Sequence, residues 1–209
     1  TVREIEEEGG AAMGCVVDIS DPNQVATMVS DVLNRFNTIH ILVNNAGIMK
    51  RTSPAESIPL DEWKTMFDIN ATGTFLCIKH VLPVFKEQKR GKIVNVSSSA
   101  GRSMSTFCGA HYSASKAAIL GLTRHIANES ASYNININAI APGSFKTEGG
   151  YELLAGAPPE LIDQEELKIP LRRFGTSEDV ARLVAFLCSE EASYITGATI
   201  DINGGDLMM

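Results

Sequence analysis

The chain has 209 residues, of which 44% are hydrophobic and 21% charged, and its net charge is −7. No apolar run approaches the roughly 20 residues that a membrane-spanning helix needs, and the acidic balance argues against a broad nucleic-acid-binding surface. The length fits one domain with a sizeable core. These values predict a soluble protein that has neither a membrane nor a nucleic acid as its partner.

The cysteines and histidines show no grouping typical of a disulfide framework or a metal site. The four cysteines are far apart and form no CxxC pair, and the four histidines have no metal-ligand spacing. We therefore expect reduced thiols, a cytoplasmic location and no bound metal. The cysteines are Cys15, Cys77, Cys108 and Cys188.

Helical and strand patterns alternate from the start of the chain. Thr1–Glu8 is typical of the end of a helix that Gly9 and Gly10 stop. The short apolar run Ala12–Asp18 fits a buried strand. A capping Asp21 followed by Pro22 then predicts the start of a helix. Its apolar stripe has helical spacing and consists of Val25, Met28, Val29, Val32, Leu33 and Phe36.

The same alternation continues to the C-terminal end. We expect strands over Ile39–Val43, Lys92–Val96, Ile135–Ile140 and Thr199–Ile202, and helices that begin at Asp61, over Ser113–Ala131 and after the capping box Thr176–Asp179. The long segment Ser144–Pro170 is predicted to be irregular, and such connections are usually lids or binding loops.

This order predicts the fold class. Near-continuous apolar strands that alternate with helices indicate a parallel sheet with helices on both faces. The chain has no internal repeat and no linker-like segment. We therefore expect one α/β domain over residues 1–209, a three-layer, doubly wound fold.

Small and polar residues follow each predicted strand. In an open parallel sheet, ligands bind beyond the carboxyl ends of the strands. Small residues there let the backbone approach a flat ligand closely. The residues at these ends are Asp18, Asn44-Asn45-Ala46-Gly47, Ser97-Ser98-Ser99-Ala100-Gly101 and Pro142-Gly143.

Tyr112 and Lys116 are one helical turn apart, so the phenol and the ammonium group share one face of the helix. A nearby cation favours the phenolate and lowers the pKa of a tyrosine from its ordinary value near 10. The tyrosine would then act as an acid or base near neutral pH. In isolation, a solvated tyrosine beside a solvated lysine is the better interpretation of such a pair.

The other motifs of the chain change this interpretation, because together with the pair they resemble the short-chain dehydrogenase/reductase family over essentially the whole length of the chain. Within that family it is most similar to bacterial enzymes of the 3-oxoacyl-carrier-protein reductase type. The resemblance rests on Asn44-Asn45-Ala46-Gly47, Ser98, Tyr112-Ser113-Ala114-Ser115-Lys116, Asn138–Gly143 and Gly197 with Asp201–Gly205, in order and spacing.

The resemblance implies a Rossmann-type fold and hydride transfer between NAD or NADP and a carbonyl or secondary alcohol. Tyr112 matches the general acid/base, and Lys116 matches the residue that lowers the tyrosine pKa and binds the nicotinamide ribose. Ser98 matches the hydroxyl that polarises the carbonyl, and Asn70 matches the asparagine that holds a proton-relay water. The implied cofactor-binding residues are Asp18, Asn44, Ala46, Gly47, Tyr112, Lys116, Pro142, Gly143 and Thr147.

Several assignments have rivals. Ser97 or Ser99 could supply the hydroxyl instead of Ser98, and Asp18 fits a turn aspartate as well as a residue that caps the adenine ring. Asn70 could be an ordinary helix residue, although asparagine is a mediocre helix former and Gly73 nearby favours a kink. Pro142 and Gly143 fit simple turn chemistry. His111 has no evident acidic partner in the sequence and is interpreted as structural or substrate-facing.

The family's glycine-rich phosphate loop and its second strand have no counterpart in this sequence, a difference of roughly 40 residues, about one βαβ unit. The residue that selects NAD or NADP lies in that unit. Without its two strands, the Ala12–Asp18 and Ile39–Val43 runs would stand about 14 Å apart, too far for ladder hydrogen bonds. We therefore expect a longer parent polypeptide.

Two hypotheses follow for the activity and assembly. The chain is most of an NAD(P)-dependent oxidoreductase, or it is a truncated, cofactor-free remnant with a binding or structural role. The family resemblance also implies a homotetramer or homodimer, formed through the long helices over Asp61–Lys89 and Tyr112–Ser132.

Overall fold

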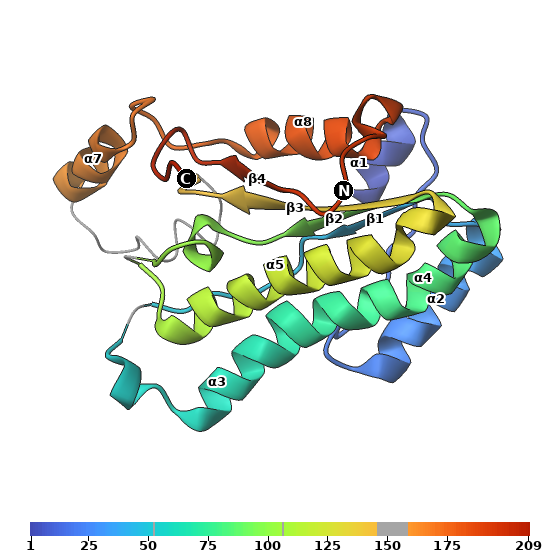
Figure 1. The fold of residues 1–209 in the computed structure, drawn as a ribbon, viewed down its shortest axis with the longest axis horizontal. Coiled ribbons are helices and arrows are strands. Elements are labelled where there is room, and N and C mark those ends of the chain that lie inside the picture. The colour runs from blue at the N-terminus through green and yellow to red at the C-terminus, as the bar shows by residue number, and fades with distance from the viewer. Residues whose placement is uncertain (52, 106, 146–158) are drawn as a thin grey trace.

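The computed structural model describes residues 1–51, 53–105, 107–145 and 159–209, and for residues 159–161 it describes only the backbone. Four parallel strands form one sheet in the order β1-β2-β3-β4 (Figure 1). Val43 pairs with Val94 in this register, and Ile140 pairs with Ile200. The strands are β1 (Ile41–Asn44), β2 (Gly91–Val96), β3 (Ile135–Pro142) and β4 (Thr199–Ile202).

Helices cover both faces of this sheet, as Figure 1 shows. On one face lie α2 (Pro22–Phe36), α4 (Thr74–Gln88) and α5 (Ala110–Ser130), and on the other lies α8 (Ser177–Cys188). The remaining helices are α1 (Val2–Glu7), η1 (Ala55–Ser57), α3 (Leu60–Phe67), η2 (Asp68–Gly73), η3 (Ser99–Gly101), η4 (Ala131–Tyr133), α7 (Pro159–Lys168) and η5 (Glu190–Ala192). The predicted three-layer α/β fold is confirmed.

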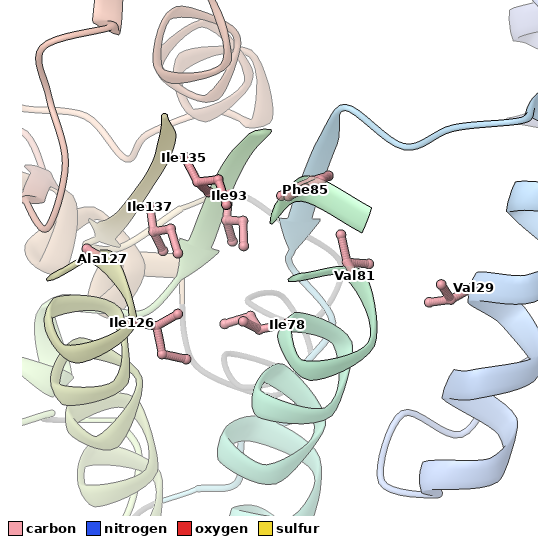
Figure 2. Close-up of a cluster of buried hydrophobic side chains, with 9 residues drawn as sticks. All are labelled: Val29, Ile78, Val81, Phe85, Ile93, Ile126, Ala127, Ile135 and Ile137. Carbon is pink, nitrogen blue, oxygen red and sulfur yellow. The ribbon is translucent and has the colours of Figure 1, made fainter. Parts of the chain in front are cut away.

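Two apolar cores lie on opposite faces of the sheet. Figure 2 shows Ile93 and Ile137 projecting from β2 and β3 toward Ile78 of α4 and Ile126 of α5. The next residue on β2, Val94, points the other way and packs with the residues of α8. Successive side chains of a strand point to opposite faces, so a sheet covered on both sides buries neighbouring positions such as Ile93 and Val94 in different cores. The strands also carry buried polar residues, which are hydrogen-bonded, namely Lys92, Asn95, Asn136 and Asn138.

Local capping signals in the sequence set two helix starts as predicted. The Asp21 side chain accepts hydrogen bonds from the backbone N–H groups of Asn23 and Gln24 at the start of α2. At α8, Thr176 and Asp179 form a capping box. Each device satisfies donors that the first helical turn leaves unpaired.

Other predicted boundaries shift. The helix predicted to begin at Asp61 begins at Leu60, so Asp61 lies in its first turn rather than at its cap. The helix predicted over Ser113–Ala131 begins three residues earlier, at Ala110, which places Tyr112 in its first turn. The predicted irregular segment Ser144–Pro170 contains the helix α7.

The strand predicted over Ala12–Asp18 is wrong. These residues are neither helix nor strand, and the side chains of Cys15 and Val16 are exposed. A strand is stabilised by ladder hydrogen bonds to a neighbour, and β1 pairs with β2 while no described strand lies on its other side.

Among the described residues, no helix combines the length and the apolar character needed to cross a membrane.

We predict that Val94→Ala destabilises the protein by about 2 kcal/mol, because it removes two methyl groups and leaves a cavity in a core where Val94 is fully buried. The matched control is Val16→Ala, since Val16 is fully exposed, and it should change stability by less than about 0.5 kcal/mol. Urea unfolding of both variants measures this difference. Equal midpoints for the two variants would contradict the assignment of Val94 to the core.

Candidate active site

A cavity of about 840 Å³ opens at the carboxyl ends of the parallel strands. Residues that follow β1, β2 and β3 line it, together with residues of α5, α7 and α8. This is the edge at which an open α/β sheet binds its ligands. Its polar lining residues include Asn45, Ser98, Tyr112, Lys116 and Ser144.

Two hydrogen bonds fix α5 against the end of β2. Lys116 Nζ donates to the carbonyl oxygen of Val96 at 3.0 Å, and the Ser97 hydroxyl donates to the carbonyl oxygen of Lys116 at 2.7 Å. The backbones also approach closely, because a Cβ placed on Gly101 would lie 2.7 Å from the carbonyl carbon of Lys116. Glycine at position 101 therefore permits the contact that brings helix and strand end together.

Tyr112 lies one turn before Lys116 and beside Ser98. The ammonium nitrogen of Lys116 is 5.8 Å from the centre of the Tyr112 ring. Ser98 has extended backbone, and its side-chain oxygen accepts a hydrogen bond from the N–H of Ala100 while the hydroxyl also interacts with the Tyr112 phenol. Ser97 is engaged by Lys116 instead. Of the rival serines, the structure thus brings Ser98 to the phenol.

Burial shifts the pKa values of both residues, and it shifts the tyrosine opposite to the prediction. Burial raises the pKa of Tyr112 to about 12, against the lowering effect of Ser98. Burial also lowers the pKa of Lys116 to about 8. Desolvation penalises the charged form of each group. The effect of burial therefore outweighs any lowering of the Tyr112 pKa by Lys116, whose Nζ donates to Val96 and is itself desolvated, and the role that the resemblance assigns to Lys116 stays a prediction.

Asn70 lies in η2, a π-helical segment that interrupts the long helix between α3 and α4. The fully buried Asn70 amide accepts a hydrogen bond from the Ile48 N–H at 2.8 Å and donates to the Ile48 carbonyl oxygen at 2.9 Å. It also donates to Ser115 Oγ at 3.0 Å. Single-turn π segments often mark functional sites. The helix is therefore interrupted near Asn70, and the hydrogen bonds of Asn70 fix the loop after β1 to α5.

The other predicted cofactor-binding residues fall into two groups. Gly47, Pro142 and Gly143 line the cavity. Asn44 and Ala46 are not among its lining residues. The Asn44 side chain instead donates a hydrogen bond to Asn95 Oδ1 of β2 at 2.8 Å. Thr147 lies outside the described residues.

Asp18 occupies the turn before α2 rather than the cavity wall. Its carboxylate accepts hydrogen bonds from the Ser20 hydroxyl at 2.7 Å and the Ser20 N–H at 2.9 Å. These bonds lower the pKa of Asp18. The structure therefore shows the turn role that the sequence left open.

Sequence reasoning missed the acidic partner of His111. The imidazole is completely buried, and its Nε2 lies 2.9 Å from Oε1 of Glu62 on α3. The two residues are remote in sequence, so no local spacing could have signalled the contact. Sequence reasoning also missed the apolar wall residues that α8 contributes to the cavity, Val180 and Val184.

Comparisons with known proteins give a consistent result. A family model described as enoyl-(acyl carrier protein) reductase matches residues 1–206. The 3-oxoacyl-[acyl-carrier-protein] reductase FabG of Staphylococcus aureus is 38% identical over 207 residues, which are 99% of this chain and 82% of that protein. The corresponding reductase of Synechocystis sp. is 38% identical over 208 residues, 99% of this chain and 81% of that protein.

Solved structures agree. Levodione reductase has a TM-score of 0.91 and 34% identity, over 96% of this chain and 80% of that one. A 3-oxoacyl-[acyl-carrier protein] reductase with bound NAD from Brucella melitensis has a TM-score of 0.89 and 35% identity, over 100% of this chain and 76% of that one. The fold and the sequence thus point to the same relatives.

The lowered pKa of Lys116 predicts a pH dependence of stability. Between pH 8 and the ordinary lysine value of 10.5, the unfolded chain binds a proton that the folded chain does not. Stability from this group therefore rises with pH across that window and is lost as pH falls through 8. The wild-type stability relative to Lys116→Met should rise by about 2 kcal/mol from pH 8 to pH 10. Urea unfolding at several pH values tests this, and parallel curves for the two proteins would contradict it.

Proposed function

Because this chain is an oxidoreductase that belongs to the short-chain dehydrogenase/reductase family, we propose that it reduces a carbonyl substrate with NADH or NADPH and uses Tyr112 as the general acid. The observation that carries the proposal is the meeting of Tyr112, Ser98 and Lys116 at one cavity wall. The enzyme class argues against a cofactor-free remnant.

The cavity has features that suit a nicotinamide dinucleotide. A Cβ on Gly47 would lie 3.0 Å from Asn70 Oδ1 and 3.4 Å from Lys116 Nζ, and one on Gly143 would lie 2.7 Å from Asn203 Cβ. Glycine at these two positions permits these close contacts, and both glycines line the cavity with backbone alone. Lys116 would donate to ribose hydroxyls, and Pro142 and Gly143 would line the nicotinamide. The bound cofactor supplies the hydride.

The protonation state of Tyr112 at neutral pH is the one that a general acid needs. With a pKa of about 12, Tyr112 carries its proton at neutral pH and can give it to an oxygen that gains negative charge. Ser98, beside the phenol, would donate a hydrogen bond to the same substrate oxygen. Lys116, with a pKa of about 8, is mostly charged at pH 7 and would stabilise the phenolate that remains. In this scheme Asn70 holds the loop after β1 and Ser115 in place, and its proposed proton-relay water would sit beside it.

The walls of the cavity indicate the character of the substrate. Met49, Met104, Phe107, Phe145 and Ile162 give them a largely apolar surface. The relatives are named for reductions of 3-oxoacyl groups and of levodione, which are carbonyl compounds. We therefore propose a ketone or 3-oxoacyl substrate whose carbonyl is flanked by apolar groups.

A groove between α4 and α5 supports the proposed homodimer or homotetramer. Phe75, Leu82, Pro83 and Leu122 are among its lining residues, and Phe75 is exposed. Exposed apolar surface of this kind commonly marks a protein interface. The groove lies on the long helices that the resemblance assigned to assembly.

We predict that Tyr112→Phe lowers kcat for carbonyl reduction by a factor of about 10² to 10⁴, because the proton donor is lost. Binding of NAD(P)H should be preserved, since the ring remains. Consumption of the reduced nicotinamide and a cofactor titration measure the two quantities.

The matched control is Tyr133→Phe, because Tyr133 is exposed in η4 and is not among the residues that line the cavity. It should reduce the same ketone at the wild-type rate. A Tyr112→Phe variant that keeps wild-type turnover would remove Tyr112 from its proposed role.

A further inference from the structure

Two residues of one long helix each contact both the loop after β1 and the start of α5. On η2, Asn70 bonds the backbone of Ile48 and the hydroxyl of Ser115. Two turns earlier, on α3, Glu62 contacts Lys50 and His111. The two contacts reach the same two segments, so they act in parallel.

The Glu62 carboxylate uses one oxygen for each partner. Its Oε2 lies 2.7 Å from Lys50 Nζ, and its Oε1 lies 2.9 Å from His111 Nε2. The interactions with Lys50 and His111 lower the pKa of Glu62. The carboxylate therefore stays ionised at neutral pH and holds both partners at once.

The His111 ring is enclosed, and neither ring nitrogen makes a hydrogen bond of good geometry among the described residues, although Nε2 lies close to Glu62. The ring is completely buried, and a Cβ on Gly109 would lie 2.7 Å from its Cε1 and 2.8 Å from its Nδ1. Among the described residues, Glu62 is the ring's charged partner. A backbone bridge between Arg51 and Cys108 fastens the same loop to the residues just before α5. The ring is thus held in one position, and this also positions Tyr112, the next residue in the chain.

The two residues of α5 that Glu62 and Asn70 contact directly precede two residues of the proposed active site. His111 precedes Tyr112, and Ser115 precedes Lys116. Cavity residues lie on both clamped segments, Ile48 and Met49 on the loop and Tyr112 on the helix. Building on the proposed function, we propose that Glu62 is a positioning residue that, through His111 and Lys50, sets the first turn of α5 and the orientation of the Tyr112 phenol toward the substrate oxygen.

The magnitude follows from the geometry of proton and hydride transfer. A displacement of about 1 Å in a reacting group can cost about a hundredfold in rate. The hydrogen bond between Asn70 and Ser115 still holds α5 in place when Glu62 is lost. We therefore expect the reaction rate to fall by about tenfold, which is less than a hundredfold. We expect little displacement of Lys116.

The test compares Glu62→Ala with Asp61→Ala, which removes the same charge from the adjacent, exposed residue of the same helical turn; the described residues give Asp61 no ion pair. For Glu62→Ala we expect kcat for ketone reduction to fall about tenfold, with the NAD(P)H dissociation constant within about twofold of wild type. The primary isotope effect from C4-deuterated nicotinamide should rise, because the misaligned chemical step becomes more rate-limiting. Amide exchange should accelerate at residues 110–116. Glu62→Gln, which keeps an acceptor for His111, should recover part of kcat.

Wild-type kcat and isotope effect in Glu62→Ala, or a lowered melting temperature with both unchanged, would overturn the proposal and leave Glu62 a purely structural role. If Glu62→Ala does not fold, Glu62→Gln and His111→Leu are judged by the same isotope effect and exchange rates. A wild-type protein that does not reduce the ketone would contradict the proposed function instead. In that case, amide exchange at residues 110–116 of Glu62→Ala tests whether Glu62 positions the first turn of α5, and an unchanged exchange rate overturns the proposal.

Discussion

The close contact between α5 and the end of β2 is the constraint on which the candidate site depends. Lys116 reaches across to the Val96 carbonyl, Ser97 returns a hydrogen bond to the Lys116 carbonyl, and Gly101 lets the two backbones approach. Ser98 follows directly after Ser97 in the chain, so the same contact carries its hydroxyl to the phenol of Tyr112. Residues from a strand end and a helix thereby meet without a flexible connection between them.

Burial gives this meeting its chemical character. The same removal from water raises the pKa of Tyr112 and lowers that of Lys116, because burial disfavours the charged form of each group. A phenol that holds its proton suits an enzyme that must protonate a newly formed alkoxide. In the proposed mechanism the amine of Lys116 would act as a partner for the phenolate and for a bound ribose.

Part of this arrangement could be predicted from the sequence. Tyr112 and Lys116 lie one turn apart on the same helix, and small residues line the cavity at the strand ends. Both features follow from local sequence patterns, which the fold preserves. The interruption near Asn70 followed from the poor helix propensity of asparagine beside Gly73, and it is the π segment η2. Capping residues at Asp21 and Thr176 were equally local.

The rest depended on tertiary neighbours that no local pattern contains. The apolar run Ala12–Asp18 is not a strand because a strand also needs a partner for its backbone. The contact between Glu62 and His111 joins two helices that meet only in the folded chain. The direction of the Tyr112 pKa shift required the burial of the phenol to be known.

The most direct measurement of the central claim compares Gly101→Ala with Gly14→Ala. A methyl group at position 101 would lie 2.7 Å from the Lys116 carbonyl carbon and 2.9 Å from the Ala117 nitrogen, whereas one at position 14 would meet Val2 at an ordinary 3.6 Å. Backbone atoms cannot yield as a flexible side chain does, so α5 must move away from η3. We predict that Gly101→Ala lowers ketone-reducing kcat at least about tenfold while Gly14→Ala keeps the wild-type value. A folded Gly101→Ala protein with wild-type turnover would contradict the account.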